Sequence, residues 1–103
     1  MKVVWTRAAA DHLEEIGDWI ARDSPAAAER LVAAIIDRVS TLGSHPHLGR
    51  PGRIVETREL VIAGTPYIVA YRVRESAVEV LAAFHGARRW PERLEEDERG
   101  GRT

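Results

Sequence analysis

The chain has 103 residues, no cysteine and a formal net charge of -1 at pH 7. This length fits one domain, and the absence of cysteine excludes disulfides and thiolate metal sites. No stretch is long and apolar enough to cross a bilayer, and the N-terminus lacks an apolar signal-peptide core. We therefore expect a cytoplasmic protein with no membrane association.

The charges are segregated along the chain. Residues 1–44 carry five basic and seven acidic groups, residues 45–94 carry eight and five, and residues 95–103 carry two and four. The basic groups of the middle segment are all arginines, which can contact carboxylates or phosphates through two hydrogen bonds, although solvated strand edges would also explain them. The small total charge disfavours strong nonspecific binding to nucleic acid. We expect one domain over residues 1–94 and a charged flexible tail over 95–103.

The first half predicts a strand followed by two helices. Lys2 to Trp5 is a short apolar run bounded by Thr6, which predicts a strand. From Arg7 to Arg22, apolar residues recur at helical spacing and acidic residues occupy the other face, as in an amphipathic helix. Ser24 before Pro25 predicts the start of a second helix, which we expect to end near Gly43. Its apolar stripe consists of Ala28, Leu31, Val32, Ile35, Val39 and Leu42.

The connection between these helices is only a few residues long, so we expect an antiparallel helical hairpin. Gly17, in the middle of the first helix, indicates either a close approach by the second helix or a tolerated weakness. We expect Trp5 and Trp19 to anchor the hairpin to the sheet, because large aromatic side chains dominate small cores.

The second half predicts an irregular loop and three strands. Residues 45–53 are rich in proline and glycine, and the two histidines of this loop have no carboxylate or cysteine beside them. We therefore expect no metal site and no cofactor. The segments Ile54 to Ala63, Tyr67 to Arg74 and Val78 to His85 are separated by short turns. Turns this short predict consecutive antiparallel hairpins.

Alternation along the last two strands indicates that both faces of the sheet are partly apolar. The helical hairpin can cover only one face, so we expect an apolar and aromatic surface with arginines on the other, available to a partner. Alternatively, the segment around Trp90 folds back over that surface. In the strand over Tyr67 to Arg74, one face is expected to carry Tyr67, Val69, Tyr71 and Val73, and the other Ile68, Ala70 and Arg72. In the strand over Val78 to His85, one face is expected to carry Val78, Val80, Ala82 and Phe84, and the other Glu79, Leu81, Ala83 and His85.

Three segments, in this order of elements, resemble the RelE/ParE superfamily, the small toxins of bacterial type II toxin-antitoxin pairs. They are Thr57-Arg58-Glu59-Leu60, Pro66-Tyr67 with Tyr71-Arg72, and His85-Gly86-Ala87-Arg88. The resemblance implies an α+β fold with the order β-α-α-β-β-β, in which a helical hairpin packs on one face of a mainly antiparallel sheet. It also implies a cognate antitoxin as partner.

Two activities occur in this superfamily. RelE-like toxins cleave mRNA in the ribosome, and their third strand commonly reads Tyr-Arg-Val-Ile-Tyr, whereas this chain has Ile68 where the arginine stands. Their last strand commonly ends in His-Arg with a tyrosine four residues later, and here Gly86 and Trp90 stand at those positions. Isoleucine cannot neutralise a phosphate, and an indole cannot act as a general acid or base. ParE-like toxins, which inhibit DNA gyrase, are not known to need these groups.

We therefore expect a ParE-like toxin that inhibits DNA gyrase and is neutralised by an antitoxin, with no direct sequence-specific DNA binding by the toxin alone. One alternative is a ribosome-dependent mRNA endoribonuclease that uses Arg58, His85 and Arg88. Another is a degenerate, non-toxic module that only binds its antitoxin.

We expect the antitoxin to lay an acidic or amphipathic segment along the arginine and tyrosine side of the sheet. The tyrosines could instead be packing residues, and His85 a structural histidine. The residues predicted to bind the antitoxin or the target are Arg58, Tyr67, Tyr71, Arg72, His85, Arg88, Arg89 and Trp90.

Overall fold

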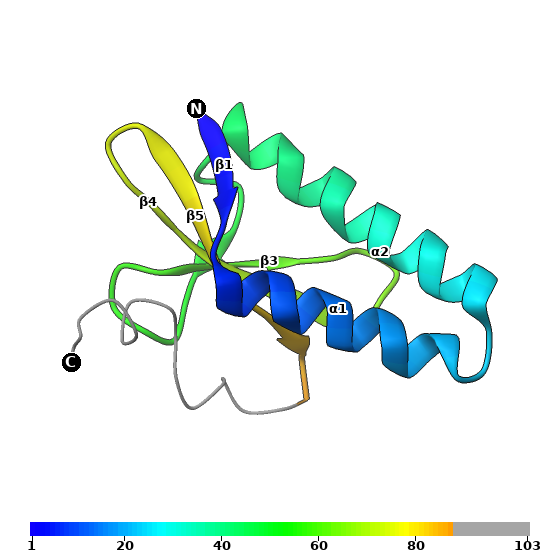
Figure 1. Ribbon diagram of the computed structural model, residues 1–103. Coiled ribbons are helices and arrows are strands. Elements are labelled where there is room, and N and C mark those ends of the chain that lie inside the picture. Colours follow the sequence, from blue (N-terminus) through cyan, green and yellow to red (C-terminus); the bar gives the residue numbers. More distant parts are fainter. Residues whose placement is uncertain (88–103) are drawn as a thin grey trace.

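A helical hairpin covers one face of a twisted five-stranded sheet in the computed structural model, which describes residues 1–87 (Figure 1). The α+β class predicted from the sequence is confirmed. The elements in chain order are β1 (Lys2–Trp5), α1 (Arg7–Ala21), α2 (Pro25–Ser40), the 3-10 helix η1 (Thr41–Gly43), β2 (Arg50–Pro51), β3 (Arg58–Val61), β4 (Tyr67–Val73) and β5 (Ala77–His85).

Side-chain caps fix the start of both helices where the sequence predicts them. The Thr6 hydroxyl accepts a hydrogen bond from the amide of Ala9 at 3.2 Å, and the Ser24 hydroxyl accepts one from Ala27 at 3.1 Å. Each cap satisfies an amide that the first helical turn leaves without a partner. The Thr6 hydroxyl also donates to the carbonyl of Val80 (2.8 Å), which ties the start of α1 to the sheet.

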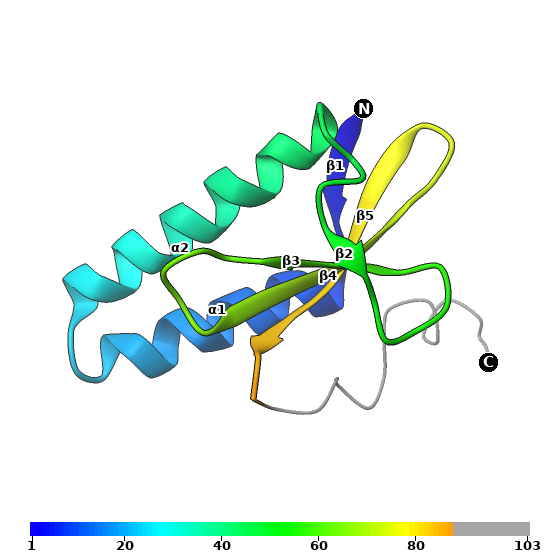
Figure 2. The same ribbon diagram turned by 180° about the vertical axis from the view of Figure 1, so that it is seen from behind.

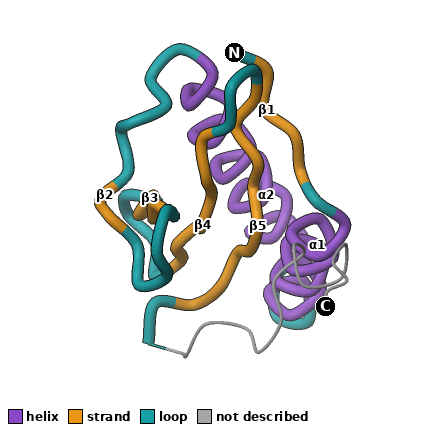
Figure 3. The backbone as a smooth tube through the Cα atoms, turned by 90° about the vertical axis from the view of Figure 1, so that its left-hand side faces the viewer, coloured by secondary structure: helices purple, strands orange, loops and turns teal. Residues whose placement is uncertain are grey.

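The sheet is mixed, with strand order β1-β5-β4-β3-β2 (Figures 2 and 3). β1 runs parallel to β5 at one edge, and all other neighbours are antiparallel. The predicted helical hairpin on a mainly antiparallel sheet is confirmed. The first strand thus pairs with the last, a parallel pairing that the long βαα crossover allows.

The strand predicted over Ile54 to Ala63 is shorter than expected. Only Arg58–Val61 pairs as β3, and the two-residue β2 lies inside the loop that we expected to be irregular. The reason is a closed turn in the preceding segment. The amide of Gly52 donates to the carbonyl of Thr57 (2.8 Å), and the amide of Thr57 donates to Ile54 (3.1 Å).

The main core lies between the helices and the sheet. Apolar side chains of both helices and η1 meet the helix-facing side chains of β3, β4 and β5, and the tyrosines of β4 belong to this core. Its buried members are Ala9, Ile35, Val39, Leu42, Leu60, Tyr67, Val69, Tyr71, Val78, Val80 and Ala83, with Ile62 just after β3.

A β-bulge in β5 changes which side chains face the helices. Ala70 pairs with Ala82 but the next residue of β4, Tyr71, pairs with Val80, so Leu81 is an extra residue in the ladder. Beyond the bulge the two faces exchange. The predicted grouping of Ala82 with Val80 is therefore wrong, because Ala83 is the residue that joins the helix-facing core.

The reverse face of the sheet, opposite the helices, is not the exposed apolar surface expected from the sequence. Ile68 and Phe84 are each only 6% exposed, and Leu81 is fully buried. The guanidinium carbon of Arg53 lies 5.4 Å from the centre of the Phe84 ring, a cation-π contact that contributes to this burial. Within the described residues, the centre of the reverse face therefore offers no open apolar patch.

The glycine and the tryptophans of the N-terminal half differ in their roles. A Cβ on Gly17 would lie 3.1 Å from Cγ2 of Val32, so this glycine permits a close approach by α2. Trp5 is half-buried and packs against the main core. Trp19 is 60% exposed beneath the Arg22 guanidinium, 4.8 Å from the ring centre, and does not anchor the hairpin as predicted.

Candidate functional site

The predicted site residues that lie within residues 1–87 do not form one site. Arg58 and Tyr71 face each other across β3 and β4, and together they hold the loop that precedes β2. Nη1 of Arg58 donates to the carbonyl of Gly49 (2.6 Å), and the Tyr71 hydroxyl donates to the carbonyl of Pro46 (2.8 Å). The Gly49 amide in turn donates to that hydroxyl at 2.8 Å. Both side chains thus support the loop.

Burial raises the pKa of Tyr71 above its ordinary value of 10.0, against smaller lowering effects of the Gly49 hydrogen bond and the Arg58 charge. Because the pKa is higher in the folded state, the contribution of Tyr71 to the unfolding free energy is fully present below pH 10. It is lost as the pH rises from 10 through the folded-state pKa. We expect Tyr71→Phe to lower the unfolding free energy at pH 7 by about 1–3 kcal/mol, because two buried partners lose their hydrogen bonds. Between pH 9 and 11, urea titrations should show a steeper loss for the wild type than for the variant; parallel curves would contradict this.

Tyr67 and His85 meet at the other end of β4. Their rings are 5.6 Å apart in an edge-to-face arrangement, and Tyr67 is only 7% exposed. Nδ1 of His85 accepts a hydrogen bond from the amide of Ala87 at 3.1 Å. Arg72 lies on the reverse face, where its Nε donates to Oε1 of Glu79 at 2.7 Å.

Arg58 and His85 are therefore far apart. Arg58 pairs with Tyr71 and His85 pairs with Tyr67, and four residues of strand separate those positions by about 13 Å. Two groups that act on one scissile phosphate must both lie within hydrogen-bond reach of it. Arg88, Arg89 and Trp90, the other predicted site residues, lie outside the described residues.

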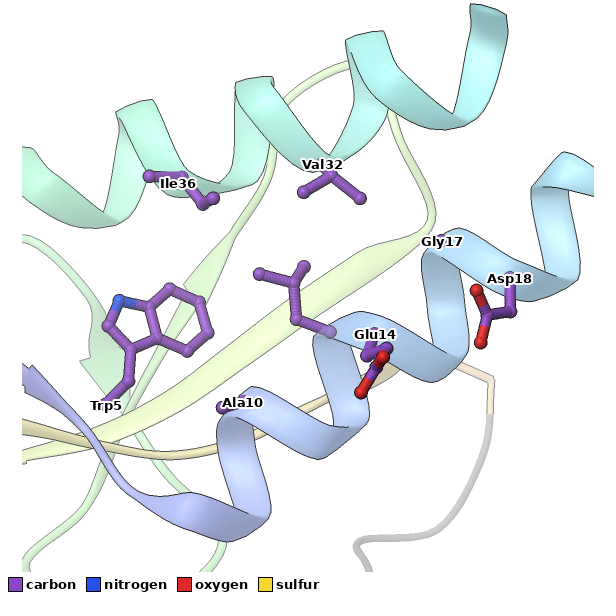
Figure 4. A pocket seen from close by; sticks show the side chains of 8 residues that line it. Trp5, Ala10, Glu14, Gly17, Asp18, Val32 and Ile36 are labelled. Carbon is purple, nitrogen blue, oxygen red and sulfur yellow. The ribbon is translucent and has the colours of Figure 1, made fainter. Parts of the chain in front are cut away.

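An apolar groove lies between the two helices (Figure 4). It has a volume of about 600 Å³, and Trp5 of β1 lies at one end. Ile36 of α2 projects over it from above and is 47% exposed, although its side chain is entirely apolar. The lining residues are Trp5, Ala10, Leu13, Glu14, Gly17, Asp18, Val32 and Ile36.

The groove continues along the hairpin toward the turn between the helices. A second hollow of about 550 Å³ shares Gly17, Val32 and Ile36 with the first and extends to Ala21 and Pro25. From Ala10 to Ala21 the helix axis rises about 17 Å, three turns of helix. The groove is therefore long enough to receive three turns of a helix from a partner protein.

Acidic side chains flank this apolar floor. Glu14 and Asp18 line the α1 side, and Glu29 lines the α2 side near the hairpin turn. An apolar floor with carboxylates at its margins fits an amphipathic segment whose apolar stripe is bordered by lysine or arginine. We expected an acidic or amphipathic segment along the arginine side of the sheet, whereas this groove suits an amphipathic segment with a basic border.

Sequence reasoning missed this groove. Ile36 follows Ile35 in α2 but is not a member of the predicted apolar stripe, and the sequence pattern assigns it to no face. An additional large apolar residue beside a complete stripe indicates a second contact surface, because one stripe suffices to cover the core. Gly17 was the other signal, since its missing side chain deepens the groove floor.

Neither membrane spans nor metal clusters occur in residues 1–87. Neither helix combines the length and hydropathy needed to cross a bilayer. Across the same residues, no three histidine, cysteine or carboxylate side chains gather where they could hold a metal ion.

Comparisons with known proteins point to one group of relatives. The family described as "ParE toxin of type II toxin-antitoxin system, parDE" matches residues 3–90. "Putative toxin Y4kP" of Sinorhizobium fredii is 46% identical over 93 residues, covering 90% of this chain and 96% of that protein. "Toxin RelE2" of Caulobacter vibrioides is 34% identical over 87 residues, covering 84% and 97%.

A solved structure is similar throughout most of the fold. The match, titled "Chromosomal ParDE TA system from P. aeruginosa", is 27% identical to this chain and has a TM-score of 0.75. It covers 82% of this chain and 95% of the matched one.

Proposed function

We propose, because this chain belongs to the ParE toxin family of type II toxin-antitoxin systems, that it arrests bacterial growth by inhibiting DNA gyrase. A cognate antitoxin holds it inactive by laying an amphipathic helix in the groove between α1 and α2. The toxin acts in the cytoplasm, and it inhibits its target by binding rather than by catalysis.

The groove is the observation that carries the antitoxin proposal. Ile36 is 47% exposed over the apolar floor and Trp5 lines it, so a partner helix laid there would remove apolar surface from water. A three-turn helix with an apolar stripe would bury these side chains, and basic residues beside the stripe would pair with Glu14 and Asp18. The structural relative titled as a ParDE system supports an antitoxin as the occupant.

The distance between Arg58 and His85 supports inhibition by binding. Arg58 of β3 pairs with Tyr71 and His85 of β5 pairs with Tyr67, four residues away along β4, and Arg58 is engaged with the carbonyls of Gly49 and His47. Ile68, which stands where RelE-like nucleases are expected to carry an arginine, is 6% exposed. These positions offer no pair of groups arranged to cleave a phosphodiester, so a stoichiometric inhibitor fits better than a nuclease.

Precursor incorporation after induction separates the two targets. When the toxin is expressed without its antitoxin, we expect incorporation of labelled thymidine to fall before that of labelled methionine, because gyrase inhibition stops replication first. Purified toxin should also slow supercoiling by purified gyrase. If methionine incorporation falls first and ribosome-bound mRNA is cut, the endoribonuclease is the correct function; if growth continues normally, the non-toxic module is.

A further inference from the structure

The loop from Gly52 to Thr57 lies at the edge of the sheet opposite β1 (Figures 1 and 2). Val55 is 84% exposed, and its neighbour Ile54 is 38% exposed. The groove, which includes Trp5 of β1, belongs to the other edge and to the helices. The loop is therefore an exposed apolar feature separate from the groove.

Hydrogen bonds and close packing hold this loop in one shape. The Gly52 amide donates to the carbonyl of Thr57, and the Thr57 hydroxyl and amide both donate to the carbonyl of Ile54. A side chain on Gly52 would collide with the Thr57 hydroxyl. Glu56 has a φ of 67°, the only positive φ of a non-glycine residue in the described part of the chain. Such strain persists only where the surrounding structure fixes the conformation, and it is common at functional sites.

A buried carboxylate anchors both sides of the loop. Glu59 is only 2% exposed and accepts hydrogen bonds from Nη2 of Arg50 (3.1 Å) and from the amide of Arg53 (3.2 Å). Nε of Arg53 lies 3.2 Å from the same carboxylate. The Arg50 side chain remains 55% exposed, so a guanidinium held by Glu59 is accessible at the base of the loop.

We propose that this loop is the contact through which the toxin engages its target protein. Ile54 and Val55 enter an apolar pocket of the target, and Arg50 pairs with a carboxylate at the rim of that pocket. An apolar tip held rigid beforehand loses little entropy on binding, and an arginine beside it matches the composition of interface hot spots. The inference rests on the proposed function, because it assigns the surface that acts on the inhibited target.

The side chains favour a protein over a nucleic acid as the occupant. Isoleucine and valine gain nothing from a phosphate backbone, and the carboxylate of Glu56 stands next to the tip, where it would repel phosphates. Nucleic-acid affinity also depends on neutralising many phosphates, and Arg50 and Arg53 are the only basic residues among residues 50–57. An apolar pocket with one carboxylate placed to meet Arg50, rather than a rim of carboxylates that Glu56 would repel, complements this loop.

The test compares Val55→Asp with Val61→Asp. Val61 is a matched control, because it is 45% exposed on β3 and lies outside the loop. We expect Val55→Asp to need at least about thirty-fold more protein for the same growth arrest and for the same inhibition of purified gyrase. Val61→Asp should match the wild type. Thermal unfolding and affinity for the antitoxin should stay unchanged in Val55→Asp, since the tip contacts solvent and is remote from the groove.

Growth arrest by Val55→Asp at wild-type protein levels overturns the inference. The inference also fails if the wild type sediments as a dimer while Val55→Asp sediments as a monomer of equal toxicity. The loop would then join two copies of the chain. If the wild type arrests growth without slowing gyrase, the gyrase proposal fails, yet the growth comparison of the two variants still decides the role of the loop. A wild type that leaves growth normal overturns both.

Discussion

Replacing Ile36 by glutamate should weaken antitoxin binding by about 100-fold, or roughly 2.7 kcal/mol, while leaving growth arrest intact. The Ile36 side chain is 47% exposed over the groove, so the free toxin loses little on substitution. In the complex, by contrast, a carboxylate would be buried against an apolar stripe, close to Glu14 and Asp18. The variant should therefore escape neutralisation: cells that carry both genes should stop growing.

Val61→Glu is the matched control for this experiment, because it places the same charge at a 45%-exposed apolar position on β3. Affinity is measured by calorimetry with the product of the adjacent antitoxin gene. If Ile36→Glu and Val61→Glu bind the antitoxin with equal affinity, the antitoxin does not occupy the groove. Ile36→Glu and Val55→Asp should have opposite effects. Ile36→Glu should lose affinity for the antitoxin and keep its toxicity, whereas Val55→Asp should keep the affinity and lose toxicity.

The N-terminal half of the fold was predictable because its signals are local. Thr6 and Ser24 cap the helices at the positions where the sequence places them, and the apolar spacing of α1 and α2 identifies the faces that cover the sheet. A cap acts within one helical turn, so neighbouring residues suffice to recognise it. The order of strands was not predictable, because pairing between β1 and β5 depends on residues about 75 positions apart.

The faces of β5 could not be assigned correctly for a related reason. Leu81, Ala82, Ala83 and Phe84 are all apolar, so this stretch shows no alternation that would reveal the bulge. A single inserted residue then reverses the facing of everything after it. The prediction of an open apolar reverse face followed from the same pattern, which cannot show that Arg53 comes to lie over Phe84.

The predicted site residues illustrate the limit of residue type as evidence. Arginine and tyrosine are common at interfaces, but Arg58 and Tyr71 bind main-chain atoms of residues 46–49. Those partners carry no side-chain signal in the sequence. Ile36, in contrast, was visible as a surplus apolar residue, and recognising it required counting how much of α2 the core can use.

Gly49→Ala should be strongly destabilising, because the loop passes too close to the sheet for a side chain at this position. A Cβ at this position would lie 2.8 Å from the carbonyl oxygen of Glu59 and 2.8 Å from the Tyr71 ring. Tyr71 is fully buried and cannot move aside without disturbing the core. We expect a loss of about 3 kcal/mol, from overpacking and from the weakened hydrogen bonds of the Tyr71 hydroxyl.

A loss of that size should lower Tm by roughly 10–20 °C in a domain of this length, as measured by calorimetry. Gly64→Ala serves as the control, because Gly64 has a φ of 81° and no atom within 4 Å of its would-be Cβ. That variant loses only the backbone preference, about 1 kcal/mol. Gly49 has no positive φ, so an alanine there would stabilise the chain if space were available. A Gly49→Ala protein at least as stable as Gly64→Ala would therefore show that the loop does not press against Tyr71, and that Tyr71 and Arg58 do not fix it to the sheet.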